Sequence, residues 1–362
     1  MSARFRSNET GGNNMKRAVK IGLWSLAVLV ALAGVGVLYL VIPGTPANGK
    51  NLAFIGFIAL PRGKLLTVLD YLSVYDGALF VTDVIAGSVH KIGLRDGGLP
   101  NGAHISTFTL EPATHGVIID PVSGLGYVTR SGANTVDIFD PIAMKLIKRL
   151  PVADDPDAIF YDSRNKLVYV ANGDADVATL IDPAAGIAVG TVPLGGKPEF
   201  AAFDSKAGLM YQNLQDVNAV AVVDPVKRAV VERWPLKRCE GPSGMAIDQA
   251  NRRLFVECMG NNMLMVLDIN TKRVVEQLAI GAGPDSVVYD EGLHRLYTTG
   301  KTGRLVVVEQ ETPDRYRIID SIKLHFGAHT LTVDPATHIL YVGYASLIAR
   351  SRIAVFSPTS PR

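Results

Sequence analysis

The sequence predicts an all-β protein, a seven-bladed β-propeller with four-stranded blades, preceded by one N-terminal transmembrane helix. Two observations predict this architecture. One segment pattern recurs seven times along the chain, and an uncharged apolar stretch of 22 residues precedes the repeats. The chain has 362 residues, of which 48% are hydrophobic and 19% are charged, so it can form a large core.

The first 50 residues carry targeting signals. Residues 1–20 form a basic tail with five Lys or Arg against one acidic residue, and residues 21–42 are uncharged. At about 1.5 Å per residue, a helix over 21–42 crosses a bilayer core of about 30 Å. The positive-inside rule then keeps the tail in the cytoplasm. A cleaved signal peptide, with a cut near Asn48, is the alternative interpretation.

Residues 43–50 are a linker, and residues 51–362 form the predicted propeller. We therefore expect a single-pass protein of the bacterial cytoplasmic membrane, held there by its N-terminal helix. The propeller would lie in the periplasm or outside the cell.

The repeats are aligned on an aspartate that follows the first apolar run of each copy. The intervals between successive aspartates are 42 or 44 residues and average 43. In the last six copies an aromatic residue follows seven positions later, whereas the first copy has its aromatic residue after only four. The aligned aspartates are Asp76, Asp120, Asp162, Asp204, Asp248, Asp290 and Asp334.

Each repeat predicts four short strands. The first is apolar at consecutive positions, as expected for a strand buried on both faces. An Asp-Pro or Asp-x-x-x-Gly turn follows, in which the aspartate accepts hydrogen bonds from the turn amides. Helical repeats would need apolar residues at i, i+3, i+4 and i+7, which no copy shows. The last copy supplies only three strands, so we expect residues 51–60 to add the fourth and close the ring.

The third copy reads LVYVAN at Leu167–Asn172, followed by VATLIDP and VGTVPLGGKP. It resembles the YVTN repeat of bacterial and archaeal surface-layer and YncE-like proteins, and the resemblance covers nearly all of residues 51–362. The resemblance implies a seven-bladed propeller in the periplasm or at the cell surface, usually without assigned chemistry. It also implies a distant similarity to seven-bladed lactonases. WD40 repeats are disfavoured, because no Trp-Asp pair ends a third strand.

Charge and motifs exclude several functions. The net charge of +2 comes from the basic tail, and the rest of the chain is slightly acidic, so no nucleic-acid partner is expected. Motifs for haem attachment, a nucleophile elbow, a His-Glu-x-x-His zinc site and a phosphate loop are all missing. An enzyme would therefore have to assemble its site from several blades.

A polar ring is predicted where the innermost strands begin, at the mouth of the central channel. Its positions lie five residues before each aligned aspartate. The predicted ligand-binding ring is Tyr71, His115, Asp157, Glu199, Ser243, Asp285 and His329. Such a ring could hold a divalent metal, with His115 and His329 as ligands, or supply an acid–base pair. The alternative interpretation is that these strand starts are polar only because the channel is wet.

Cys239 and Cys258 are predicted to form a disulfide. Both fall on the same rim of the fifth blade, in an oxidising compartment. Two free buried thiols are the alternative.

The sequence thus favours a non-catalytic propeller that binds a partner protein or a small ligand on the rim carrying His115 and His329. A metal-assisted hydrolase of the lactonase type, using the channel-mouth histidines and acids, is the alternative. A purely structural or adhesive repeat protein is a third class of function.

Overall fold

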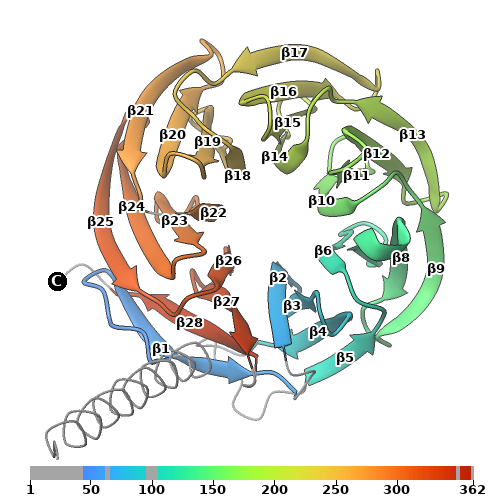
Figure 1. Cartoon of the computed structure of the whole chain (residues 1–362), viewed down its shortest axis with the longest axis horizontal. Coiled ribbons are helices and arrows are strands. Elements are labelled where there is room, and N and C mark those ends of the chain that lie inside the picture. Colours follow the sequence, from blue (N-terminus) through green and yellow to red (C-terminus); the bar gives the residue numbers. More distant parts are fainter. Residues whose placement is uncertain (1–43, 62–65, 95–104, 282, 348–350, 360–362) are drawn as a thin grey trace, which may run out of the picture. The chain divides into compact units, whose positions relative to one another are not determined.

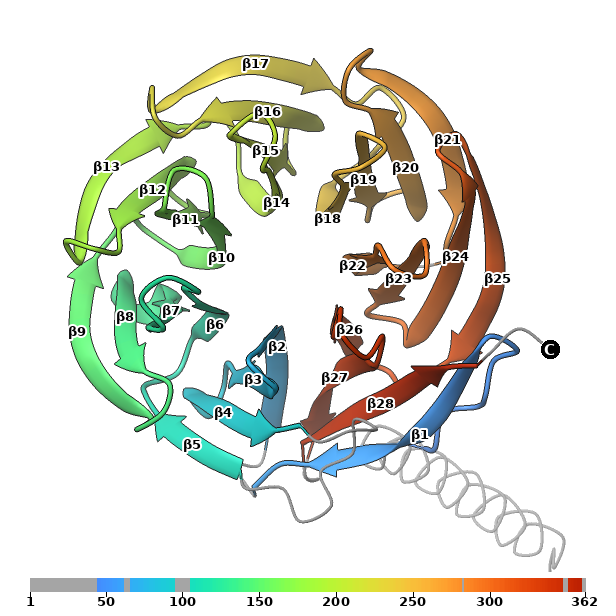
Figure 2. The ribbon, with the colours of Figure 1, turned by 180° about the vertical axis from the view of Figure 1, so that it is seen from behind.

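The computed structural model describes residues 44–61, 66–94, 105–281, 283–347 and 351–359. These residues form strands and one short 3₁₀ helix, η1 (Ser131–Ala133), arranged as sheets around a central axis (Figure 1). Figure 2 shows the ring from behind. The expected basic tail at 1–20 and the expected anchor at 21–42 lie outside the described residues. Within the described ranges, no helix is both long and apolar enough for a membrane span.

In the described part of the chain, the strands form five four-stranded antiparallel sheets and one eight-stranded sheet. The first two four-stranded sheets along the chain are β6 (Thr114–Ile119), β7 (Gly126–Arg130), β8 (Thr135–Asp140) and β9 (Lys145–Pro151), and then β10 (Pro156–Asp162), β11 (Leu167–Asn172), β12 (Val177–Asp182) and β13 (Ile187–Pro193). The next two are β14 (Pro198–Asp204), β15 (Leu209–Leu214), β16 (Ala219–Asp224) and β17 (Ala229–Pro235), and then β18 (Pro242–Asp248), β19 (Arg253–Cys258), β20 (Met263–Asp268) and β21 (Arg273–Ala279). The fifth is β22 (Pro284–Asp290), β23 (Arg295–Gly300), β24 (Arg304–Thr312) and β25 (Arg315–Lys323).

The eight-stranded sheet joins two units of four strands. One contains β2 (Leu66–Tyr75), β3 (Ala78–Asp83), β4 (Ser88–Gly93) and β5 (Ile105–Thr109), and the other contains β26 (Ala328–Val333), β27 (Leu340–Leu347), β28 (Arg352–Pro358) and β1 (Leu52–Ala59). They meet where the start of β2 pairs with the end of β27. Each unit of four strands is called a blade below. Repeated four-stranded blades around an axis make a β-propeller.

The core lies between adjacent blades. The aromatic residues that recur in the sequence are buried there: Tyr211, for example, is 2% exposed and its ring lies 5.1 Å from that of Trp234. Both pack in one cluster with Leu254 and Met265 of the following blade. Since each blade buries its apolar face against the next, hydrophobic stabilisation depends on neighbouring blades staying in contact.

The ring is closed by its N-terminal strand. β1 pairs antiparallel with β28, from Leu52 opposite Pro358 to Ala59 opposite Arg352, which confirms the expected closing strand. Just before β1, the amides of Lys50 and Asn51 donate to the Asp320 carboxylate, at 2.8 and 2.7 Å. The pairing covers the edge that β28 would otherwise expose.

The aligned aspartates shape the turns as expected and also connect blades. Asp204 Oδ1 accepts the amides of Lys206 and Ala207, both at 3.0 Å, as the turn pattern predicted. The same carboxylate accepts two hydrogen bonds from the Arg252 guanidinium of the next blade, at 2.7 and 2.6 Å. Asp248 and Asp290 likewise accept bonds from Gln310 and His338 of the following blades, so the turns form a chain of contacts between blades.

The first repeat is shifted by one residue relative to the sequence alignment. Tyr75 pairs with Ala78 across a two-residue turn, in which Asp76 and Gly77 have φ of 46° and 65°. In the third repeat it is the aligned aspartate, Asp162, that pairs across the turn. Tyr75 therefore takes the place of the aligned aspartate in the first repeat, and Asp76 belongs to the tighter turn.

We predict that Arg252→Met lowers the free energy of unfolding by about 3 kcal/mol, because it leaves the fully buried Asp204 carboxylate without its counter-charge. Chemical denaturation of the full-length protein measures this. Lys272→Met is the matched control, because its ion pair with Glu232 is solvent-exposed and should contribute far less to stability. Equal losses in both variants would contradict the blade-to-blade role of Arg252.

Candidate functional site at the channel mouth

A β-bulge in each innermost strand, near the strand start except in the longer β2, turns side chains toward the channel. In β10, Pro156 pairs with Asn172 and Ile159 with Val170, so two residues, Asp157 and Ala158, oppose one residue of β11. The innermost strands of all described blades shift register at the equivalent point. Bulges re-aim side chains and often lie beside functional sites. The first residues of the bulges are Asp70, His115, Asp157, Glu199, Ser243, Asp285 and His329.

This set differs from the predicted ring at one position. Asp70, not Tyr71, is the first bulge residue of β2, because the tight turn after Tyr75 shifts the first repeat by one residue. Tyr71 takes the second bulge position, which is occupied by Gly116 in β6, Ala158 in β10 and Gly244 in β18, but by Phe200 in β14. A Cβ at Gly116 would come within 2.6 Å of the Asp157 carbonyl oxygen, so in β6 this position leaves no room beside the next blade.

Three of the bulge residues converge. Asp70, His115 and Asp157 come from three consecutive blades, and one ligand atom of each lies within 4.8 Å of the others. His115 Nδ1 lies 2.8 Å from Asp70 Oδ2 and 3.7 Å from Asp157 Oδ1. These three residues are called the His115 cluster below. Among the described residues, no other group of three histidine, cysteine or acidic side chains comes this close together.

The orientation of the His115 ring is fixed from its other side. Its Nε2 lies 3.0 Å from Ser131 Oγ, so Nδ1 faces the two carboxylates. Burial alone would lower the pKa of His115, but the hydrogen bond to Asp70 and the charges of Asp157 and Asp70 outweigh it and raise the pKa to about 9. Burial, and then the charge of Asp70, raise the pKa of Asp157. The cluster therefore holds a proton on His115 between two carboxylates.

The other predicted ring residues lie around the same mouth but not in this cluster. Ser243 is 1% exposed and its hydroxyl donates to the Pro284 carbonyl oxygen at 3.2 Å. Asp285 Oδ1 lies 3.3 Å from Lys301 Nζ. His329 Nδ1 donates to the Gly327 carbonyl oxygen at 2.9 Å. Glu199 has a pKa raised to about 7 by burial and by the charge of Asp285.

Side chains from non-adjacent blades meet inside the channel. The Tyr71 ring, from β2, stacks on the Phe200 ring, from β14, with centroids 5.1 Å apart and planes 20° apart. Phe160 of β10 meets the same Phe200 ring at 6.4 Å. Burial raises the pKa of Tyr71, and the charges of Asp157 and Asp70 raise it further. Aromatic rings thus fill the channel at the level of the polar mouth.

The two cysteines are bonded in the structure. Cys239 lies in the loop before β18 and Cys258 ends β19, and their Sγ atoms are 2.02 Å apart. The bridge closes a loop on the same rim as the channel mouth, because β19 ends where β18 begins.

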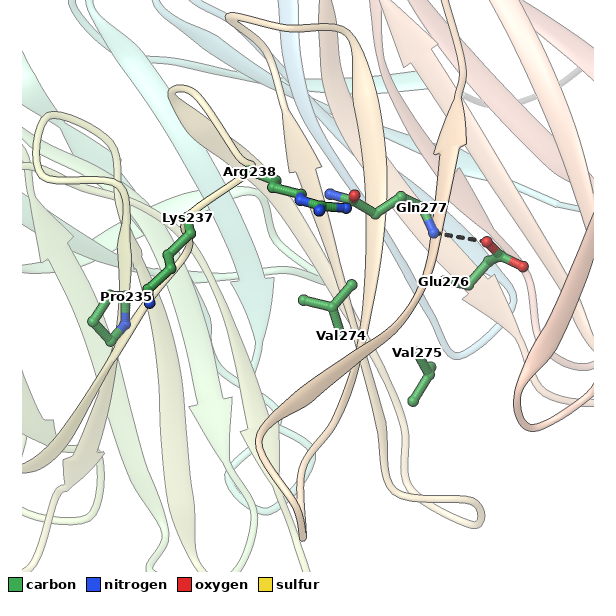
Figure 3. A pocket seen from close by; sticks show the side chains of 7 residues that line it. All are labelled: Pro235, Lys237, Arg238, Val274, Val275, Glu276 and Gln277. Carbon is green, nitrogen blue, oxygen red and sulfur yellow. Dashed lines mark hydrogen bonds between the residues drawn. The ribbon is translucent and has the colours of Figure 1, made fainter.

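Two grooves lie away from the channel, between outer strands. One of about 510 Å³ is lined by Pro235, Lys237, Arg238 and residues 274–277, and Figure 3 shows its side chains on β21, at the end of β17 and in the turn after it. The other, of about 650 Å³, lies between β21 and the β24–β25 hairpin. Neither brings titratable groups together as the channel mouth does, so the mouth is the candidate site.

The comparisons with known proteins concern the fold. No protein-family model matches the chain, and no curated protein matches it. Solved structures do resemble it. Hydrazine synthase of Kuenenia stuttgartiensis aligns with a TM-score of 0.68 and 14% identity over 83% of this chain and 98% of that one.

Two lyases align equally well. Virginiamycin B lyase from Staphylococcus aureus has a TM-score of 0.68 and 13% identity over 84% of this chain and 98% of its own. A streptogramin B lyase has a TM-score of 0.68 and 14% identity over 86% of this chain and 100% of its own. At these identities the likeness establishes the propeller fold and nothing of the chemistry.

We predict that replacing both cysteines, Cys239→Ser with Cys258→Ser, lowers the free energy of unfolding by roughly 3 kcal/mol, the entropy of opening a loop of this length. Denaturation of exported protein, with and without the substitutions, measures the loss. Non-reducing peptide mapping should join the two cysteines. Quantitative alkylation of both thiols in denatured, unreduced protein would contradict the bond.

Proposed function

We propose that this protein is an extracytoplasmic binding propeller that holds a divalent cation at the channel mouth and, through it, a small ligand, without catalysing a reaction. The observation that carries the proposal is the convergence of Asp70, His115 and Asp157 from three blades. Imidazole and carboxylate are ligands shared by Zn²⁺ and Mn²⁺.

The spacing of the ligand atoms suits a metal ion. With metal–ligand bonds of about 2.1 Å, neighbouring ligand atoms lie roughly 3.0 Å apart in an octahedral shell and roughly 3.4 Å apart in a tetrahedral one. The separations from His115 Nδ1, 2.8 Å to Asp70 and 3.7 Å to Asp157, bracket these values. Three protein ligands leave positions for water or a bound ligand.

The surroundings of the cluster support the same proposal. Ser131 binds the other nitrogen of His115, which is how a metal-bound imidazole is usually oriented. Asp157 Oδ1 is buried and has no hydrogen-bond partner among the described residues. A cation beside it would supply the missing partner.

A metal-assisted hydrolase is the second candidate, and Glu199 is the observation that favours it. Its pKa of about 7 suits proton transfer at neutral pH. A divalent ion would supply a bound water of lowered pKa. Lactone hydrolysis by the metal-loaded protein, lost in Glu199→Gln while metal uptake persists, would favour this candidate over the binding module.

We also propose the number of blades, the repeat family and the membrane anchor of this protein. Counting the eight-stranded sheet as two blades gives a seven-bladed ring, in line with the seven repeats. The LVYVAN segment at 167–172 supports a place among YVTN-repeat, YncE-like propellers. The uncharged stretch at 21–42 and the basic tail before it support a membrane anchor with the propeller outside the cytoplasm.

We predict that the purified full-length protein binds near one equivalent of Zn²⁺ or Mn²⁺ and that His115→Ala weakens this binding at least a hundredfold, because it removes the central ligand. Equilibrium dialysis with metal analysis measures the affinity. His329→Ala is the matched control: it removes a histidine at an equivalent bulge outside the cluster and should change the affinity less than twofold. Equal effects of the two substitutions, or no uptake by the wild type, would refute the site.

We predict that the affinity of the protein for the metal ion depends on pH. Coordination requires His115 to lose its Nδ1 proton, and its pKa is raised to about 9. Below that pH the apparent affinity should fall about tenfold per pH unit, since one proton is displaced for each metal bound. Chelator should also lower the melting temperature, because the ion stabilises only the folded state.

We predict that a reporter active only outside the cytoplasm works when fused after Arg362, because the basic residues before residue 21 hold the N-terminus inside. Reporter activity in intact cells measures this. A reporter that works only in the cytoplasm should be silent at the same position. Activity of that second fusion would overturn the topology.

A further inference from the structure

The groove of about 650 Å³ between the end of β21 and the β24–β25 hairpin has the features of a second binding site. Figure 1 shows β21, β24 and β25 at the outer edge of the ring, away from the channel (Figure 1). The volume lies within the range of pockets that hold small ligands, about 300–1,000 Å³. This groove is called the β24–β25 groove below.

Two basic side chains line one end of this groove. Arg304, the first residue of β24, pairs directly with Lys323, the last residue of β25, and both are exposed. Like charges directly opposite each other on antiparallel strands destabilise the pair. None of the described residues that line the groove is acidic. The lining therefore has two positive charges and no negative charge of its own.

The fold does not require this pair of charges. In each described blade the first residue of the third strand lies opposite the last residue of the outer strand. The equivalent pairs are Ser88 with Thr109, Thr135 with Pro151, Val177 with Pro193, Ala219 with Pro235, Met263 with Ala279, and Arg352 with Ala59. Two cations therefore oppose each other at this place only between β24 and β25, among the described blades.

The Arg304 side chain is held in position from two sides. Its Nη1 donates to Ser321 Oγ at 2.6 Å. A Cβ at Gly281, in the loop after β21, would come within 3.1 Å of Arg304 Cδ, so the stem of the side chain lies against that glycine. A guanidinium group fixed in this way presents its remaining N–H donors in a set direction, which suits a carboxylate or a phosphate.

The rest of the groove is mainly apolar. Along the hairpin, the charged pair comes first, then Val306 opposite Ser321, and then Ile318. Ile318 is 38% exposed, whereas Val306 and Ile280 are buried beneath the groove. An apolar ligand that covers Ile318 would remove its surface from water, which is favourable. The groove thus joins a cationic end to an apolar floor.

We infer that the β24–β25 groove binds a small phosphate monoester with an apolar chain, with the phosphate between Arg304 and Lys323 and the chain along Ile318. A phosphate monoester carries a charge of about −2 at neutral pH, which matches the two cations. Its oxygens accept hydrogen bonds from the guanidinium and ammonium groups. The Ser321 hydroxyl, which accepts from Arg304, keeps its own proton to donate to the ligand.

Hexyl phosphate, titrated calorimetrically into the full-length protein without added divalent metal, tests the groove. The double variant Arg304→Met, Lys323→Ala should weaken binding by about tenfold or more, because it removes both cations. The substitutions give this blade the pair that the preceding blade has, Met263 opposite Ala279, so the blade should fold. Without ligand, the melting temperature of the variant should be no lower than that of the wild type, since a repulsion is removed.

The matched control is Lys237→Met with Arg238→Ala, which removes two exposed basic residues from the groove shown in Figure 3. That groove lies one blade earlier and also contains the acidic Glu276. The control should bind hexyl phosphate as tightly as the wild type. No binding by the wild type, or equal losses in the two double variants, would overturn the inference. Metal uptake at the His115 cluster does not enter these measurements, so the two proposals stand or fall separately.

Two further probes separate the charge from the chain. Hexyl sulfate has the same shape but one charge fewer, and it should bind severalfold more weakly than hexyl phosphate. Methyl phosphate keeps the charge and lacks the chain. Ile318→Asn should therefore weaken the binding of hexyl phosphate severalfold and leave that of methyl phosphate unchanged. Equal affinities for hexyl sulfate and hexyl phosphate would contradict a doubly charged ligand, and an unaffected Ile318→Asn variant would contradict the placement of the chain.

Discussion

The packing of each blade against the next is the interaction on which the rest of this structure depends. A blade has a buried face on both sides, and its recurrent aromatic residue is covered partly by the blade that follows, as Tyr211 is by the cluster around Leu254 and Met265. Hydrophobic burial thus operates between units rather than within them. The aspartate turns add polar contacts along the same seams, as between Asp204 and Arg252. A ring assembled this way has no blade that is stable alone.

The geometry of the His115 cluster also depends on the packing between blades. No blade contributes more than one residue to the His115 cluster, so the 2.8 and 3.7 Å separations exist only because packing fixes the angles between blades. The bulges supply the second requirement, since they turn one polar side chain per blade toward the axis. The polar groups then lie in a crowded, partly buried mouth where burial and mutual charge raise the pKa values of Asp157 and Glu199.

Much of the fold could be predicted from the sequence, because strand patterning and turn residues are local and repeat seven times. The closing role of residues 51–60 could also be predicted, from one missing strand. Asp70 could not, since the Asp76-Gly77 turn has two residues and counting from the aligned aspartate selects Tyr71 instead. Nor could the sequence separate His115 from His329, because equivalent positions carry no information on distances across a ring.

The pairing of β1 with β28 also affects how the protein folds during synthesis. Lys50 and Thr359 share a hydrogen bond although 309 positions separate them in the chain. At about 10 residues per second, roughly half a minute passes between synthesis of the two partners. During that interval β1 has no strand to pair with, and its apolar residues remain available to chaperones, proteases and other nascent chains. β1 can therefore be paired, and its apolar residues buried, only after β28 has been synthesised.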